Sequence, residues 1–317
     1  MKPADDIRRI DSSDRTLAAG RIECDLNGER SLLSLAAVTM KATVAGRVSL
    51  LRVEQRFQNP HTVPVEAVYI FPLPGGCAVS DFELKVGTRV VKGEVRERME
   101  ARRGYAQAKA EGKRAALMEQ ERDDVFTVTV GNLPPGEEIA VRIECSDQLA
   151  YFDDGMTELR LPVVVAPRYI RGTLLDGEPV GHGVAGDTDG VPDASRITPP
   201  RLAEGFDPKV ALKIEVELLA DGEEIRDLEC TQHAVRTGLS ADRVTVRLSA
   251  EAEPLDRDFV LRWRVASAAV RSSCLAFTDH RGVRYAALSV VPPRRDGFLG
   301  RPRGRGTWSS CWTAPGR

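Results

Sequence analysis

The sequence of 317 residues is poor in aromatic side chains and in net charge. Aromatic residues make up 5% of the chain, which argues against a surface that stacks nucleic-acid bases. The 45 basic and 47 acidic residues leave a formal net charge of −2, so no overall field favours nucleic acid or an anionic membrane. We therefore expect no nucleic-acid partner.

Long apolar stretches are also missing. Residues 1–20 carry acidic side chains close to Met1 and contain no continuous apolar run, which distinguishes them from a secretory signal peptide. No later segment reaches the roughly 18 apolar residues that a membrane-spanning helix needs. We expect residues 1–20 to form a disordered arm. We also expect a protein without a membrane span that, as written, is cytoplasmic.

Cysteine and histidine occur without metal-binding or catalytic spacing. The six cysteines form no C-x-x-C pair, which favours buried free thiols over a zinc site or a disulfide framework. The histidines lie in predicted loops or turns, away from any G-x-S-x-G elbow or H-E-x-x-H helix, and the chain has no G-x-x-x-x-G-K-[ST] motif. We therefore predict no enzymatic activity, and no catalytic residue, metal ligand or cofactor in this chain. The histidines are His61, His182, His233 and His280.

One catalytic alternative stays open, because the members of a Ser-His-Asp triad come together only in the fold. It is a hydrolase whose site is built from loops in the second half of the chain. A pocket that joins His233 or His280 to a carboxylate and to a serine or cysteine would favour it.

Alternation of apolar and polar residues dominates the first half of the chain. Residues 51–57 alternate in this way, which is the pattern of a strand with one buried face. Residues 126–130 and 139–143 alternate on either side of the turn sequence GNLPPGEE, which predicts a hairpin. Residues 96–124 are rich in Glu, Arg, Ala, Lys and Gln, which predicts a helical insertion between the β elements.

A long connector is predicted at residues 173–205, which are rich in Gly, Pro, Asp and Ser. Its carboxylates Asp187, Asp189 and Asp193 invite comparison with a calcium loop. An EF-hand loop that begins at Asp187 would place valine and threonine where the fifth and twelfth positions need ligands. We therefore predict no metal site in the connector.

The motifs between residues 55 and 137 resemble the VIT domain, the vault protein and inter-alpha-trypsin inhibitor heavy chain domain. This resemblance implies a compact β domain without catalysis of its own, which usually precedes a von Willebrand type A domain. It also implies a structural or partner-contact role for the side chains that carry it, which we call the signature residues. They are Gln55, Phe57, Asn59, Phe71, Pro72, Leu73, Pro74, Tyr105, Ala116, Leu117, Glu119, Gln120, Phe126, Asn132, Pro135 and Gly136.

Further alternating runs at residues 210–218, 244–248 and 259–265 predict a second β unit. The predicted fold is mainly β. An antiparallel β-sandwich VIT domain with a helical insertion occupies residues 21–172, and a second, smaller β-sandwich-like unit occupies residues 206–292.

Residues 293–317 abandon the alternation, and we expect a disordered tail. In proteins that the VIT region resembles, a type A domain would begin here with an apolar strand and a D-x-S-x-S metal motif. Translation from the third base of the Gly306 codon permits D-V-V-F-V-L-D-R-S-G-S, in which a Val, the Leu and the second Asp are forced. We hypothesise that the chain is the N-terminal part of a longer bacterial VIT and type A protein, truncated by a frameshift or sequencing error.

A non-catalytic protein-interaction or scaffold module is the function that this hypothesis predicts. Its partner would be a protein or its own missing type A domain, and a divalent metal would belong only to that missing domain. A non-functional truncated product is the remaining alternative. Resequencing the gene past the Pro302 codon tests the hypothesis, since an in-frame stop without type A coding sequence in any frame would contradict it.

Overall fold

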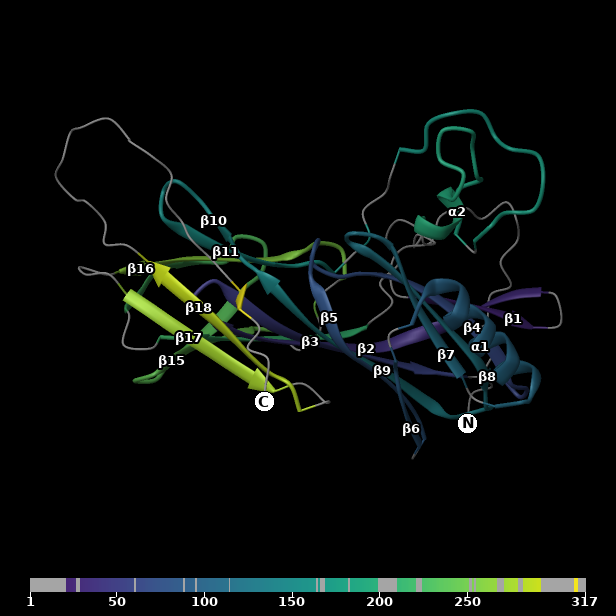
Figure 1. Cartoon of the computed structure of the whole chain (residues 1–317), viewed down its shortest axis with the longest axis horizontal. Coiled ribbons are helices and arrows are strands. Elements are labelled where there is room, and N and C mark those ends of the chain that lie inside the picture. Colours follow the sequence, from purple (N-terminus) through teal and green to yellow (C-terminus); the bar gives the residue numbers. More distant parts are fainter. Residues whose placement is uncertain are drawn as a thin grey trace.

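The computed structural model describes residues 21–26, 29–59, 61–87, 89–94, 96–113, 115–163, 165, 169–181, 183–198, 210–220, 224–250, 253, 255–266, 271–278, 282–291 and 311–312. These residues are mostly in strands, as predicted (Figure 1). The helices are α1 (Arg98–Ala110) and α2 (Ala194–Ile197). The strands are β1 (Arg21–Leu26), β2 (Glu29–Ala45), β3 (Val48–Gln58), β4 (Val65–Pro72), β5 (Ala78–Val86), β6 (Arg89–Lys92), β7 (Ala115–Arg122), β8 (Val125–Leu133), β9 (Glu138–Gln148), β10 (Ala150–Tyr151), β11 (Met156–Leu161), β12 (Ala211–Leu219), β13 (Glu224–Glu229), β14 (Val235–Leu239), β15 (Arg243–Leu248), β16 (Phe259–Ala266), β17 (Arg271–Thr278), β18 (Arg284–Val291) and β19 (Cys311–Trp312).

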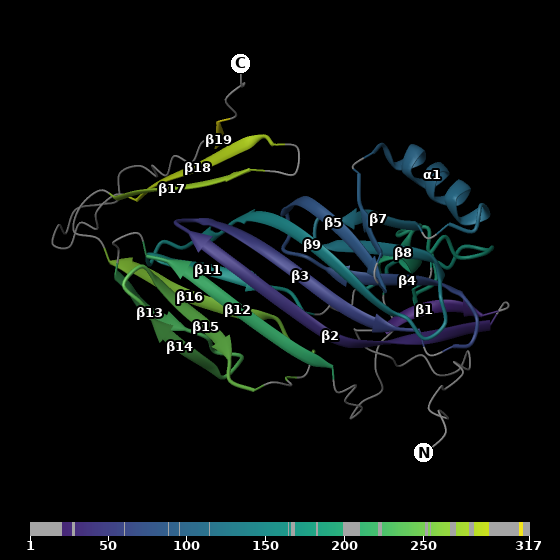
Figure 2. The same ribbon diagram turned by 90° about the horizontal axis from the view of Figure 1, so that it is seen from below.

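The largest sheet runs in the order β6-β5-β9-β3-β2-β1-β4-β8-β7 (Figure 2). Strand β2 lies at its centre. Residues 29–34 of β2 pair with β1, whereas residues 37–45 pair with β3 on one side and with β12 on the other. A register shift between Leu35 and Ala37 separates the two parts. One long strand therefore connects two regions of sheet.

The strands predicted as a second unit hydrogen-bond directly to the strands of the first. Strand β12 runs parallel to β2 over residues 211–219, and β16 pairs with β11. Phe57 and Phe71 of the first region share one buried apolar cluster with Val216 and Trp263 of the second. The predicted β elements are thus present, and they are joined by hydrogen bonds and by a common core.

The helical insertion is shorter than predicted. Helix α1 ends at Ala110, and Gly112 follows it with a φ of +69°, a conformation that glycine adopts without steric cost. Residues 115–122, which we predicted to be helical, form β7 and pair with β8. These residues favour a helix by intrinsic propensity. They form a strand because they pair with β8 and because alternate side chains pack against the apolar cluster, and such contacts outweigh propensity.

The predicted hairpin at residues 126–143 is wrong, although both of its strands exist. Strand β8 pairs with β4 and β7, whereas β9 pairs with β3 and β5. Two consecutive prolines, Pro134 and Pro135, lie between them. Because β8 and β9 pair with different strands, the connection between them crosses from one part of the sheet to another. Nearer the end of the chain, β17 and β18 pair in an antiparallel hairpin.

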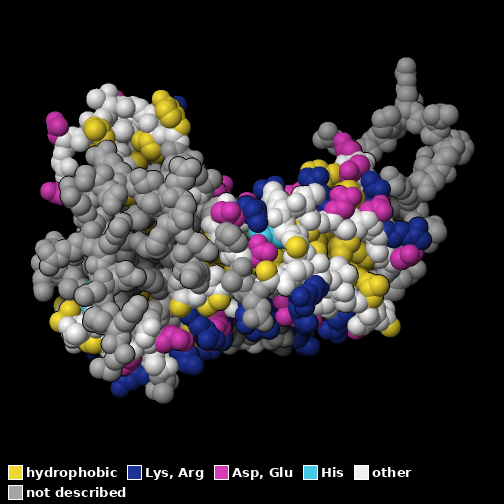
Figure 3. All heavy atoms as spheres, turned by 180° about the vertical axis from the view of Figure 1, so that it is seen from behind, with side chains coloured by type: hydrophobic (Ala, Val, Ile, Leu, Met, Phe, Trp, Pro, Cys, Tyr) yellow, Lys and Arg dark blue, Asp and Glu magenta, His cyan; other side chains and the backbone are white. Residues whose placement is uncertain are grey.

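Among the described helices, none is long and apolar enough to cross a membrane. On the face in Figure 3, acidic and basic side chains are interspersed. The predicted arm at residues 1–20 and most of the predicted tail lie outside the described residues.

Candidate functional site

Four aromatic residues near the VIT motifs form a row in the core. The ring centroids of Phe57 and Tyr69 are 5.1 Å apart in an edge-to-face arrangement, and those of Tyr69 and Phe71 are 5.2 Å apart and stacked. Phe126 continues the row 5.9 Å from Phe71. The amide of Gln55 donates a hydrogen bond to the hydroxyl of Tyr69, and burial raises the pKa of that hydroxyl. The signature residues Gln55, Phe57, Phe71 and Phe126 are thus buried in the core.

Asn59 fixes the connection between β8 and β9. Its side chain is completely buried, and its Nδ2 donates hydrogen bonds to the carbonyls of Leu133 and Pro134 at 3.1 and 3.0 Å. Its own carbonyl accepts a hydrogen bond of 2.9 Å from the backbone N–H of Gly136. Gly136 has a φ of +69°, and Pro135 precedes it in the turn. The signature residues of this loop therefore hold the crossing between the two strands.

Pro72, Leu73 and Pro74 lie where β4 ends. Leu73 is buried, and its backbone N–H donates a hydrogen bond to the carbonyl of Asp124 at 3.2 Å. All three residues line a groove of about 650 Å³. Asp147 lines the same groove, and burial raises the pKa of its carboxyl. The signature proline motif thus combines a core residue with the wall of a groove.

Helix α1 is held against the sheet by polar contacts with Glu66 of β4. The hydroxyl of Tyr105 donates a hydrogen bond of 2.6 Å to one carboxylate oxygen, and Nζ of Lys109 lies 2.6 Å from the other. Burial, together with the negative charge of Glu66, raises the pKa of Tyr105. A Cβ at Gly131 would lie 3.0 Å from the Tyr105 hydroxyl, so the glycine leaves room for this contact.

Asn132 holds the C-terminal end of α1. Its Nδ2 donates hydrogen bonds to the carbonyls of Lys109 and Lys113, at 3.2 and 2.8 Å. Its backbone is in the left-handed region, with a φ of +56°, which asparagine tolerates better than most residues. This signature residue connects β8 to the end of the helix.

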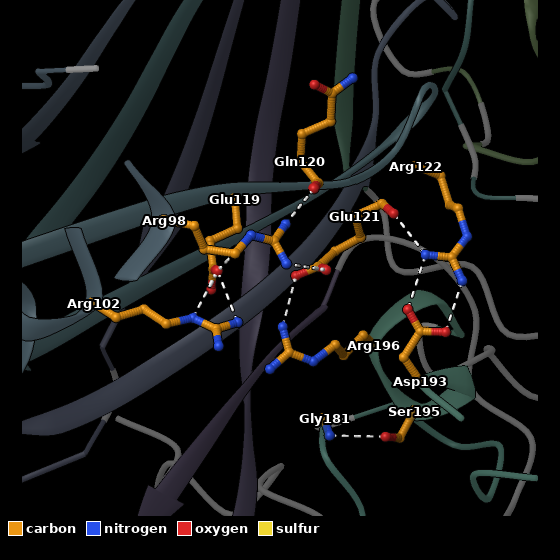
Figure 4. A network of polar contacts seen from close by, with 10 residues as sticks. All are labelled: Arg98, Arg102, Glu119, Gln120, Glu121, Arg122, Gly181, Asp193, Ser195 and Arg196. Atoms are coloured by element: carbon orange, nitrogen blue, oxygen red, sulfur yellow. Dashed lines mark hydrogen bonds and ion pairs between the residues drawn. The ribbon is translucent and has the colours of Figure 1, made fainter. Parts of the chain in front are cut away.

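The N-terminal half of α1 is joined to β7 by arginine contacts (Figure 4). Arg102 lies 2.8 Å from the carboxylate of Glu119. Arg98 donates a hydrogen bond of 2.5 Å to the carbonyl of Gln120 and lies 3.5 Å from the carboxylate of Glu121. Alternate residues of β7 therefore face the helix. Between them, Ala116 and Met118 pack against the apolar cluster, and Leu117 is half-buried.

A second set of ion pairs joins β7 to the segment that contains α2 (Figure 4). The guanidinium of Arg122 contacts both carboxylate oxygens of Asp193, at 2.9 and 2.7 Å, and Arg196 lies 3.3 Å from Glu121. The hydrogen bond and charge of Arg122 lower the pKa of Asp193. Glu121 is thus shared by arginines from α1 and α2.

The connector carboxylates act as hydrogen-bond acceptors. Asp187 accepts hydrogen bonds of 2.8 Å from the backbone N–H groups of Ser195 and Val180, and Asp189 accepts one of 2.8 Å from that of Thr173. Burial alone would raise the pKa of Asp187, but these donors outweigh it and the pKa is lowered. Within the described ranges, no group of three or more His, Cys, Asp or Glu side chains is placed to hold a metal ion.

The histidines are not gathered into a site by the described residues. The side chain of His233 is buried, with Nδ1 3.7 Å from the carboxylate of Glu253 and the ring stacked 5.8 Å from that of Phe259. Neither ring nitrogen has a hydrogen-bond partner in the described structure. His182 and His280 lie outside the described residues. The ring of His233 therefore lacks both a nucleophile in hydrogen-bond contact and access to solvent.

Helix α1 turns a continuous stripe of exposed residues away from the sheet. Met99, Arg103, Ala106 and Ala110 are all exposed, and their spacing of three and four residues places them on one side of the helix. We call these four residues the α1 outer face. Met99 is 57% exposed. No residue of the helix is buried.

Residues 35–145 match the family model of the vault protein inter-alpha-trypsin domain. This part of the chain is a VIT domain, as the signature residues predicted. The chain is 39% identical over 140 residues to protein mono-ADP-ribosyltransferase PARP4 of Mus musculus, which covers 44% of this chain and 7% of that protein. It is 32% identical over 142 residues to von Willebrand factor A domain-containing protein 5A of Homo sapiens, an alignment that covers 44% of this chain and 18% of that protein.

These alignments span only a small part of the relatives' length. Among solved structures, the chain is similar to an M1 zinc metallopeptidase from Deinococcus radiodurans, with a TM-score of 0.34 and 10% identity over 86% of this chain and 50% of that one. A likeness of this size carries no argument about fold or function.

Proposed function

We propose that the VIT domain is a non-catalytic protein-interaction module that presents the α1 outer face to a protein partner. The observation that carries this proposal is the way in which α1 is retained. The helix buries no residue, so it adds little to the apolar core. An isolated helix of 13 residues is marginal in water. Polar contacts with Glu66, Glu119 and Asn132 therefore hold the helix in place.

The composition of the α1 outer face supports a protein partner. Methionine and arginine are enriched in protein interfaces, and Met99 and Arg103 lie one helical turn apart on this face. The small side chains of Ala106 and Ala110 allow a partner to approach the helix backbone closely. A von Willebrand factor A domain is the partner class that we favour, because several curated relatives are named for that domain.

We further propose that the protein needs no cofactor in this region and works in the cytoplasm. Cys77, Cys145, Cys230 and Cys274 are free thiols, which agrees with a reducing compartment. The enclosed ring of His233 argues against the hydrolytic alternative, since a general base must reach the proton that it abstracts.

The test compares two double variants, each of which replaces one exposed apolar residue and one exposed arginine by glutamate. Met99→Glu with Arg103→Glu alters the α1 outer face, and Leu239→Glu with Arg236→Glu alters exposed residues of β14. Partners of the wild-type chain are captured, identified by mass spectrometry and purified, and their Kd is measured by calorimetry. We expect at least a tenfold weaker Kd for the α1 variant only. Equal Kd values for all three chains would contradict the proposal.

A further inference from the structure

Two buried cysteines lie at neighbouring strands, each two residues along the chain from a residue that lines the groove, Gly75 and Asp147. Cys77 directly precedes β5, and Cys145 lies in the neighbouring strand β9. The register pairs Ala78 with Ser146 and Val79 with Cys145, so its continuation places Cys77 two residues from the position opposite Cys145. Side chains two residues apart point to the same face of a sheet. Both thiols therefore face the same core.

The two thiols are in direct contact. The side chains of Cys77 and Cys145 hydrogen-bond to each other, and both residues belong to the buried apolar cluster. Cys77 is 8% exposed and Cys145 is 2% exposed. Both are free cysteines. A disulfide between them would bring their Cβ atoms to within about 4.5 Å of each other.

The backbone before Cys77 can supply that approach. Cys77 follows Gly75 and Gly76, and Gly76 has a φ of +81° with no atom within 4 Å of a Cβ placed there. The backbone N–H of Cys77 donates a hydrogen bond of 3.1 Å to the carbonyl of Pro74, which lines the groove. Cys77 is therefore the member of the pair that lies in a turn and next to an open surface.

The environment gives the two thiols different roles. The hydrogen bond from Cys145 lowers the pKa of Cys77, against the opposing effects of burial and of the charge on Asp147. The same hydrogen bond, together with burial, raises the pKa of Cys145. Cys77 is also the more exposed of the two thiols and lies in the turn before β5, so it is the member that an oxidant reaches first.

We propose that Cys77 and Cys145 form a reversible disulfide when the protein meets a peroxide. The Cys77 thiolate attacks one oxygen of hydrogen peroxide, the O–O bond breaks, and the products are a Cys77 sulfenic acid and hydroxide, which takes up a proton to give water. The sulfur of Cys145 then attacks the sulfenic sulfur, its proton leaves with the hydroxyl group as a second water, and the S–S bond forms. Two thiols lose two electrons and the peroxide gains them. A dithiol reductant reverses the reaction by exchange.

The first test uses the wild-type chain and needs no substitution. Trypsin releases Cys77 in the peptide of residues 57–85 and Cys145 in the peptide of residues 143–160, each with one cysteine. After treatment with hydrogen peroxide and alkylation of remaining thiols, we expect these two peptides to be cross-linked. Dithiothreitol should return both as free thiols. Cys230 and Cys274 serve as internal controls that should not be linked to each other. Alkylation of both Cys77 and Cys145 after peroxide treatment would overturn the proposal.

The second test separates the two roles. In Cys145→Ser, the sulfenic acid at Cys77 has no thiol to resolve it, so dimedone should label Cys77 after peroxide treatment. In Cys77→Ser, Cys145 should remain unlabelled. Circular dichroism checks that each variant is folded, and Cys→Ala variants replace any that is not. Equal labelling in the two variants would contradict the assignment of Cys77 as the attacking thiol. These readouts do not depend on the proposed protein partner.

Discussion

The hydroxyl of Tyr105 lies 2.6 Å from a carboxylate oxygen of Glu66, and this contact joins the middle of α1 to β4. The helix has no buried residue, so its position depends on a few polar contacts of this kind. Tyr105→Phe removes the hydroxyl and keeps the ring. We expect a loss of about 1 kcal/mol in the free energy of unfolding. Relative to the wild type, amide hydrogen exchange should increase more in α1 than in β3. Unchanged exchange in α1 would show that the hydrogen bond does not hold the helix.

Asn132 offers a way to separate a hydrogen bond from a backbone conformation. Asn132→Gly removes both side-chain hydrogen bonds to the end of α1 but keeps the left-handed conformation easily. Asn132→Ala removes the same bonds and adds a steric cost of about 1 kcal/mol. We expect both variants to increase exchange at residues 109–113. Urea denaturation should show the alanine variant to be the less stable. Equal stability of the two variants would mean that the end of β8 changes its backbone conformation and so avoids the steric cost.

Asn59 has the largest predicted effect on stability. In Asn59→Ala, the buried carbonyl of Leu133 and the half-buried carbonyl of Pro134 lose this donor. We expect a loss of about 2 to 3 kcal/mol, because an unsatisfied buried polar group costs its full desolvation energy. Urea denaturation measures the loss. A substitution at the exposed Lys85 is the control, and it should change stability by less than about 0.5 kcal/mol.

The ion pair between Arg122 and Asp193 predicts a dependence on pH. The pKa of Asp193 is lowered from its ordinary value of 3.8, so the unfolded chain binds a proton to this group at a higher pH than the folded protein does. The contribution of the pair to stability is therefore complete above pH 3.8 and is lost as the pH falls through the lowered pKa. Asp193→Asn should abolish this part of the dependence. The measurement is the pH dependence of exchange in residues 183–198 of both proteins.

His233 predicts a stabilising substitution. Both nitrogens of its buried ring lack hydrogen-bond partners in the described residues. His233→Leu has a similar volume and removes the unsatisfied polar atoms. We expect the free energy of unfolding to rise by about 1 kcal/mol at neutral pH. Since Arg257 lies 3.6 Å from Glu253, that carboxylate keeps a cationic partner in the variant. A clear loss of stability would indicate that the histidine is held by contacts beyond the described residues.

Local patterns predicted the strands better than their partners. The alternation of residues 51–57 is seen directly in β3, whose side chains are buried at every second position. The pairing of β12 with β2 joins residues more than 170 positions apart, and no local pattern encodes it. The same holds for β8 and β9, since their alternation gives each a buried face but does not choose its neighbours.

The polar contacts of α1 could be predicted only in part. Tyr105, Glu119 and Asn132 were signature residues, whereas Glu66, Arg122 and Asp193 were not. Alternating acidic residues in β7 gave a local signal, because Glu119 and Glu121 occupy one side of the strand, whereas Ala116 and Met118 on its other side pack against the apolar cluster. Their arginine partners come from distant segments. The sequence therefore indicates that charges must be paired there, and only the fold shows by which residues.

The position of β2 between two regions of sheet has a practical consequence for how the VIT domain can be isolated. A fragment cut to residues 35–145 would lose β12, which pairs with residues 37–45 of β2, and would also lose β1, which pairs with β4. It would leave the backbone N–H and C=O groups of β2 open along an unpaired edge, and open edges recruit strands from other molecules. Such a fragment should self-associate in light scattering, whereas a fragment that ends after β16 should remain monomeric. The paired strands of the sheet thus extend beyond the residues that the family model matches.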